Sequence, residues 1–122
     1  MKDFILLHYN QDNSIVGVNV NNIVCAAFTE DKKCSQLYVE GEEDTIYCVN
    51  ETPTMIMKLA GETRKFILVH SRSTNNDVII PKDIIHTVKE NTVGSVISIT
   101  NTAFADFDVN EKVSSVIDML NS

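Results

Sequence analysis

Apolar and polar positions follow nearly the same order twice along this chain. The apolar run Phe4–His8 returns as Phe66–His70, and the triplet Val49–Glu51 returns as Val109–Glu111. The spacing between copies falls from 62 to 60 residues, so the two halves differ by two loop residues. A unit of about sixty residues buries too little surface to be comfortably stable alone. We therefore expect the two copies to share one core.

Each half predicts several short strands followed by one helix. Short apolar stretches, some of them alternating, predict strands in the first half over residues 4–9, 15–20, 23–28, 36–40 and 45–49. The second half predicts strands over residues 66–70, 78–80, 95–100 and 103–109, with Ile84 and Ile85 matching Ile23 and Val24. Pro81 ends the strand over 78–80.

Helix signals close each half. Thr52 and Pro53 fit an N-cap and a first helical position, and Gly61 fits the residue just past the helix end. The predicted apolar face of this helix consists of Ile56, Leu59 and Ala60. The second helix has the clearest stripe in the chain, with Val113, Val116, Ile117 and Leu120 spaced for one face, and Asn110 is its best N-cap candidate.

These elements predict an α+β fold. We expect one compact domain over residues 1–122, made of repeat 1 (1–62) and repeat 2 (63–122) packed as a pseudo-symmetric pair. In each repeat, antiparallel strands precede a helix whose apolar face covers a sheet.

Composition fits an ordinary globular protein. The chain has 122 residues, of which 43% are hydrophobic and 22% charged. Its longest apolar runs contain four residues, far short of the roughly twenty that cross a bilayer. The N-terminus is too polar for a secretory signal, so we expect a cytoplasmic protein without a membrane segment.

The three cysteines lie in the first half and lack a Cys-x-x-Cys spacing. We therefore expect reduced thiols. Cys25 and Cys48 fall in apolar, strand-like stretches, which predicts burial. Cys34 follows two lysines in a predicted turn, where we expect a surface thiol whose pKa those lysines could lower.

Charge is unevenly distributed. The net charge is −7, with −6 on residues 1–63 and −1 on residues 64–122. An acidic chain disfavours nonspecific nucleic-acid binding as a whole, but the second half carries a local basic stretch. Its members are Arg64, Lys65, Arg72, Lys82 and Lys89.

Histidine is the other candidate for chemistry. His8 and His70 end the two matching strands, and if those ends met they could form half a metal site or a pH-sensitive contact. A solvated or hydrogen-bonded histidine is the alternative. Asp106, Asp108 and Asn110 begin like a calcium loop, but Glu111 stands where that loop needs glycine. No catalytic motif or phosphate-binding glycine loop is present, so we expect neither enzymatic activity nor a cofactor.

The pattern resembles the FlbD-like family of small flagellar and swarming-motility proteins, and related uncharacterised bacterial and phage proteins. The residues that carry the resemblance are Asn19, Ile23, Val49, Glu51, Thr52 and Ile56 in the first half, and Pro81, Ile84, Val109, Glu111 and Val116 in the second. Members of that family are usually one unit long, and Lys112 replaces the small hydroxyl residue that normally caps the helix. The resemblance implies a non-catalytic fold unit.

Together these features predict a non-catalytic interaction or adaptor module. Its protein-binding surface would lie on an exposed sheet edge or between the two repeats. The alternative is a nucleic-acid-binding regulator that uses the basic stretch over residues 64–89, tested by whether those bases gather on one face. A third class, small-ligand binding, would need a closed apolar pocket between the repeats.

Overall fold

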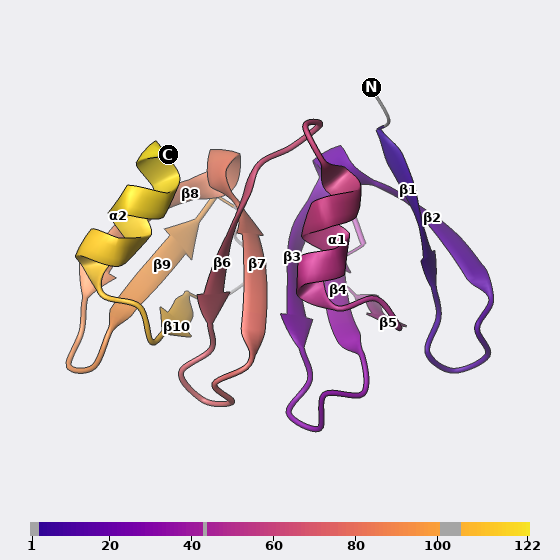
Figure 1. The fold of residues 1–122 in the computed structure, drawn as a ribbon, viewed down its shortest axis with the longest axis horizontal. Helices are drawn as coiled ribbons and strands as arrows, with labels where there is room; N and C mark the ends of the chain where they lie inside the picture. The colour runs from indigo at the N-terminus through magenta and orange to yellow at the C-terminus, as the bar shows by residue number, and fades with distance from the viewer. Residues whose placement is uncertain (1–2, 43, 101–105) are drawn as a thin grey trace.

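The computed structural model describes residues 3–42, 44–100 and 106–122 and has an α+β fold, as predicted (Figure 1). The first half consists of β1 (Phe4–His8), β2 (Ile15–Asn19), the 3₁₀ turn η1 (Val20–Asn22), β3 (Ile23–Phe28), β4 (Ser35–Val39), β5 (Ile46–Val49) and helix α1 (Pro53–Ala60). The second half consists of β6 (Phe66–His70), β7 (Asp77–Pro81), η2 (Lys82–Ile84), β8 (Ile85–Glu90), β9 (Ser95–Ile99), β10 (Phe107–Val109) and helix α2 (Val113–Asn121).

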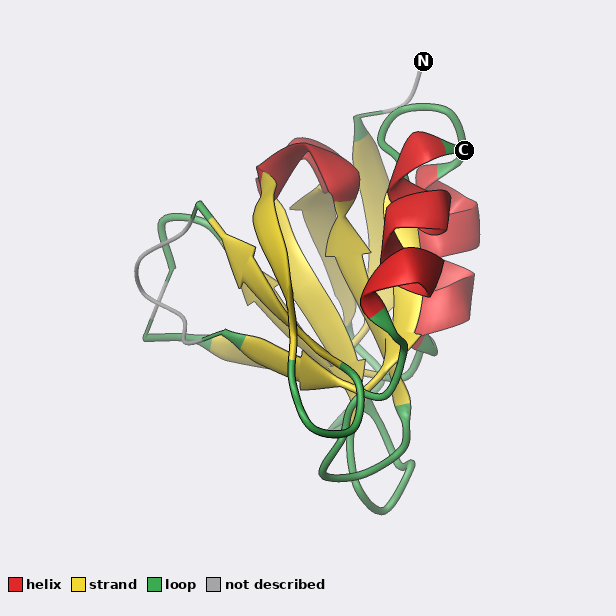
Figure 2. Ribbon diagram, turned by 90° about the vertical axis from the view of Figure 1, so that its left-hand side faces the viewer, coloured by secondary structure: helices red, strands yellow, loops and turns green. Residues whose placement is uncertain are grey.

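One five-stranded sheet runs through both halves, in the order β5-β4-β3-β7-β6. Its central ladder joins β3 to β7 through the antiparallel pairs Ala26 with Ile79 and Ala27 with Val78. The strand pair β1-β2 and the sheet β8-β9-β10 complete the fold. In Figure 1, β2 and β8 lie toward opposite ends of the long axis, and Figure 2 shows both α-helices on the same side of the strands.

Strand registers match between the halves. Phe4 pairs with Asn19 as Phe66 pairs with Pro81, and each later pair in β1-β2 has its counterpart 62 residues on. Both long ladders also carry a bulge at the same place, after Ile23 and after Ile85. Ile85 is therefore the counterpart of Ile23, and our alignment of Ile84 and Ile85 with Ile23 and Val24 was wrong by one residue.

The two-residue difference lies in the next hairpin. Residues 29–34 connect β3 to β4, whereas residues 91–94 connect β8 to β9. Pseudo-symmetric packing of the halves as whole bodies stays a prediction.

The interior divides into two apolar clusters, where we expected one. The first-half cluster includes Leu7, Leu37 and Ile56, and it also takes in Phe66 and Ile79 from the second half. The second-half cluster is made of Ile67, Val69, Val78, Ile80, Ile97, Val109 and Val116, with Ala27 of the first half packed against it. The second half thus completes the core of the first.

Helix α1 begins and ends as predicted. The Thr52 hydroxyl accepts the backbone N–H of Met55 at 3.2 Å, Pro53 opens the helix, and Gly61 follows its end at φ +55°, a left-handed value that favours glycine. Ile56 and Ala60 are buried, but Leu59 is 50% exposed, so its place on the apolar face was wrong.

Helix α2 departs further from expectation. Lys112 occupies its N-cap and makes no side-chain capping bond, so the prediction of Asn110 as N-cap was wrong. The Asn110 amide instead donates to the Asn75 side chain at 2.6 Å. Of the predicted stripe, Val116 is fully buried and Ile117 is 39% exposed.

The predicted last strand, residues 103–109, is observed as β10 over Phe107–Val109, and residues 103–105 lie outside the described part of the chain. No helix within the described residues has the length and apolar character needed to cross a membrane.

Candidate interaction surface

The repeated histidine and glutamate form the same contact in both halves. His8, at the end of β1, donates its backbone N–H to Glu51 Oε1 at 2.9 Å, and its Nδ1 lies 2.7 Å from Glu51 Oε2. The corresponding distances between His70 and Glu111 are 2.9 and 2.6 Å. We call each pair a clip, because it fixes the end of the first strand of a half to the residue just before the helix cap.

Electrostatics favour a charged clip. Burial opposes ionisation of Glu51, but its hydrogen bonds from His8 outweigh that cost and lower the pKa of Glu51. The hydrogen bond to Glu111 raises the pKa of His70, and the carboxylate of Asp77, 3.2 Å from Nε2, adds to this. Both ring nitrogens of His70 therefore face carboxylates, which leaves neither nitrogen free to bind a metal or to act as a base.

The structure brings each histidine to a glutamate of its own half. No interaction between the imidazoles of His8 and His70 occurs within the described residues, and no cluster of three or more His, Cys, Asp or Glu side chains there could hold a metal ion. The repeated residues that we considered as a metal or pH-sensitive site thus form two separate structural contacts.

Arg64 is a structural residue. Its side chain is only 9% exposed, and Nη1 donates to the carbonyls of Val20 and Ile23 at 2.9 and 2.7 Å. Nε and Nη2 bind the two carboxylate oxygens of Asp83 at 2.9 and 3.1 Å, and these bonds lower the pKa of Asp83. One guanidinium therefore connects η1 of the first half to η2 of the second.

The other predicted nucleic-acid contacts have varied surroundings. Lys65 pairs with Glu62 at 2.9 Å, and Lys82 Nζ donates to the Ser122 carbonyl at 3.1 Å. Arg72 and Lys89 are exposed. Since Arg64 and Lys65 precede β6 whereas Arg72 follows it, the structure does not gather the five bases at one place.

A groove of about 680 Å³ lies where the halves meet. Phe28 and Thr29 line it from the first half, and Arg72, Val78 and Asp108 from the second. It is open to solvent and carries both charged and apolar side chains. This is unlike the closed apolar pocket that small-ligand binding would need.

The outer face of β1 and β2 is apolar and uncovered. Phe4, Leu6 and Ile15 are 63%, 62% and 64% exposed. Phe66, the counterpart of Phe4 in β6, is 8% exposed, and Leu68, the counterpart of Leu6, is partly buried against the first-half core. We call Phe4, Leu6 and Ile15 the bare face, because the same positions of the second half are largely covered.

Packing explains this difference. Helix α1 contacts β7 and β3, so it spans the ladder that joins the halves. Its buried side chains Ile56 and Ala60 share the first-half core with Phe66 and Ile79. Sequence reasoning missed the bare face because Phe4 and Phe66 stand in the same local pattern. The one local signal was Ile15, an apolar residue at the place that Asp77 occupies in the second half.

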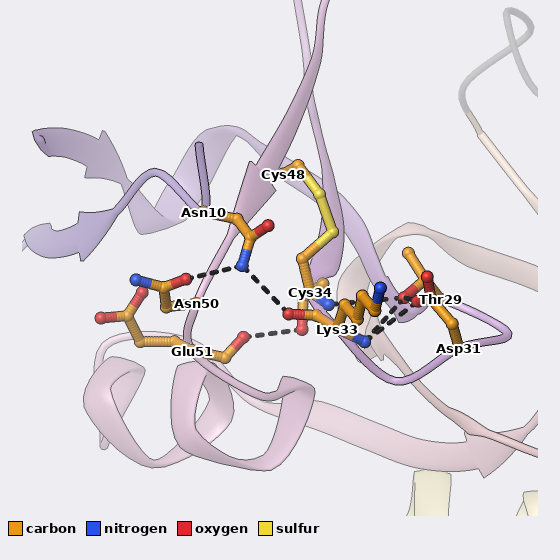
Figure 3. The surroundings of a disulfide bond; sticks show 9 residues. Asn10, Thr29, Asp31, Lys33, Cys34, Cys48, Asn50 and Glu51 are labelled. Atoms are coloured by element: carbon orange, nitrogen blue, oxygen red, sulfur yellow. Dashed lines mark hydrogen bonds between the residues drawn. A yellow bond between two sulfur atoms is a disulfide. The ribbon is translucent and has the colours of Figure 1, made fainter. Parts of the chain in front are cut away.

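Two cysteines form a disulfide bond (Figure 3). Cys34 is joined to Cys48, with 5.7 Å between their Cα atoms, so the expectation of reduced thiols was wrong for this pair. Cys34 is also 3% exposed, which corrects its assignment as a surface thiol. The register explains the bond: Ser35 pairs with Val49, which places Cys34 diagonally across from Cys48.

The third cysteine, Cys25, is a free buried thiol. It is 1% exposed, and burial raises its pKa to about 12. Its burial was predicted from the apolar stretch around it.

No protein-family model, curated protein or solved structure matches the chain. The resemblance to the FlbD-like family therefore stays a prediction.

Proposed function

We propose that this protein is a non-catalytic interaction module and that its bare face binds a protein partner. The observation that carries the proposal is the exposure of Phe4, Leu6 and Ile15, each above 60%, on two adjoining strands. A cluster of large, uncovered apolar side chains is characteristic of a binding surface. The chain covers most of the equivalent surface on β6 and β7 with its own first half, which supports a matching contact at β1 and β2.

The surroundings of the titratable groups support a role without catalysis. Both ring nitrogens of His70 and one ring nitrogen of His8 lie beside carboxylates in the clips. The alternative of a nucleic-acid-binding regulator has weaker support, because Arg64, Lys65 and Lys82 already bind protein atoms.

The cytoplasm stays our prediction for the location, and the disulfide bond argues against it. Disulfides are rare in cytosolic proteins because cellular thiols keep cysteines reduced. The oxidation state of Cys34 and Cys48 in protein isolated without reductant would decide between the two.

Site-specific photo-crosslinking tests the proposed surface. A photoreactive residue would replace Leu6 on the bare face or, as a matched control, Leu59 on α1, which is 50% exposed. In the cells that make the protein, we expect a protein adduct from position 6 and none of that mass from position 59. Adducts of equal yield from both positions, or none from position 6, would contradict the proposal.

A further inference from the structure

We infer that the partner of the bare face is a second copy of this chain, which presents its strand β8 and helix α2. This inference rests on the proposed function and names its partner. The contact would repeat, between copies, the contact that β7 and β6 make with β3 and α1 inside one copy.

The internal contact is the template. Strand β7 pairs with β3 through Ile79 with Ala26 and Val78 with Ala27. The same pair of strands, β6-β7, also supplies Phe66 to the first-half core. The contact thus combines a short ladder of backbone hydrogen bonds with apolar packing under a helix.

Both surfaces needed to repeat this contact are present and exposed. Strand β2 matches β7, and its Ile15 and Gly17 are exposed, whereas β7 is almost entirely buried. Strand β8 matches β3, and its His86 and Thr87 are exposed, whereas β3 is buried over its first four residues. In the sheet order, β2 and β8 each have one strand neighbour, while β7 and β3 each have two.

Unpaired edges of this kind recruit another strand through their free N–H and C=O groups. Moving the β3-β7 register by 62 residues gives the expected pairing between copies. Val88 of one copy would face Gly17 of the next, and Lys89 would face Val16.

Side-chain size supports the pairing. Ala60 of α1 and Ile79 of β7 share the first-half core, a small residue together with a large one. Their counterparts are Leu120 of α2 and Gly17 of β2, where the large residue has changed sides. A Cβ at Gly17 would meet only Leu6, 3.9 Å away, so the space above Gly17 is open to a side chain such as Leu120 from another copy.

Exposure on α2 supports it as well. Met57 of α1 is partly buried against the core that contains Phe66, whereas its counterpart Ile117 is 39% exposed. The bare face would cover Ile117 as β6 and β7 cover Met57.

The two surfaces lie at opposite ends of the molecule (Figure 1). The contact is therefore head-to-tail, because each copy uses its bare face toward one neighbour and β8 toward the other. Interfaces of this type build rings or filaments, and they differ from a twofold dimer, in which both copies use the same surface.

Complementary variants test this geometry. Leu6→Glu blocks the bare face and Ile117→Glu blocks the α2 side, and both positions are exposed, so neither change removes a core residue. Sedimentation velocity should show that the wild-type chain self-associates and that each variant alone does so about 10- to 100-fold more weakly. Leu59→Glu, the matched control, should associate as the wild type does.

The decisive sample mixes the two blocked variants. Each retains the surface that the other lacks, so the mixture should form a dimer of one copy of each and nothing larger. A wild-type chain that stays monomeric at millimolar concentration, or blocked variants that do not combine, would overturn the head-to-tail contact.

A cysteine pair provides a second measurement that does not depend on the charged variants. Gly17→Cys together with Val88→Cys should give, on mild oxidation, a ladder of covalent multimers, and neither single variant should extend beyond a dimer. Absence of the ladder would count against the inferred register.

The crosslinking experiment separates the two proposals. If the wild type is monomeric but position 6 crosslinks to a different protein, the proposed function stands and this inference falls. If position 6 gives no adduct and the chain is monomeric, both fall.

Discussion

Replacing Glu51 by alanine removes the acceptor of two hydrogen bonds at once. The backbone N–H of His8 loses its partner at 2.9 Å, and the imidazole loses a carboxylate oxygen at 2.7 Å. Hydrogen bonds to charged groups contribute about 1.5–3 kcal/mol each, but the His8 side chain is 40% exposed and solvent screens its share. We expect the free energy of unfolding to fall by about 2–3 kcal/mol.

Glutamine at position 51 separates the two contributions. It keeps an acceptor for the backbone N–H of His8 but removes the negative charge, so we expect a loss of about 1 kcal/mol. Urea unfolding at neutral pH, followed by circular dichroism, measures both variants. Glu111→Ala tests the same contact in the second half, where the glutamate side chain is 19% exposed and the loss should be somewhat smaller.

Glu62→Ala is the matched control. Glu62 is 86% exposed and pairs only with Lys65 at the surface, so its removal should change the free energy of unfolding by less than about 0.5 kcal/mol. If Glu51→Ala costs no more than Glu62→Ala, the clip does not stabilise the fold and our explanation of the repeated motif is wrong.

Three further predictions concern the second half and the disulfide. Because the folded-state pKa of His70 is raised above 6.5, its stabilisation is complete below that pH and is lost as the pH rises through the folded-state value; unfolding from about pH 6 to about pH 9 should show this loss in the wild type and less of it in Glu111→Gln, and equal slopes would contradict it. A Cβ on Gly94 would collide with the backbone carbonyl of Val109, so Gly94→Ala should lower the free energy of unfolding by about 1–3 kcal/mol, whereas Gly17→Ala, with open space, should change it by less than about 0.5 kcal/mol. Thiol titration in denaturant without reductant should find one free thiol per chain and three after reduction, and three at the outset would show that the disulfide is absent.

Much of the fold could be predicted from the sequence because its signals are local. Thr52, Pro53 and Gly61 each act within one helical turn, so the bounds of α1 followed from residue chemistry alone. Strand order within each half followed from short apolar runs separated by polar turns. The repeated triplets Val49–Glu51 and Val109–Glu111 were recognised as a pattern, and their glutamates prove to be clip residues.

What the sequence did not reveal depends on neighbours distant along the chain. Phe4 and Phe66 occupy identical local patterns, and only the placement of α1 over β7 decides which of them is buried. The disulfide required the strand register that places Cys34 diagonally across from Cys48. Asn110 was a good capping residue on paper, but the loop after β6 presents Asn75 to its side chain.

The unequal sharing of the interior has a consequence for synthesis on the ribosome. The first-half cluster needs Phe66 and Ile79, which are translated only after α1 is complete. The nascent N-terminal segment therefore emerges with an unfinished interior, and its final packing has to wait for β6 and β7. During that interval the vacant edge of β3 is open to strands from other nascent chains, which makes the pace of translation through residues 61–81 a determinant of the yield of correctly folded protein.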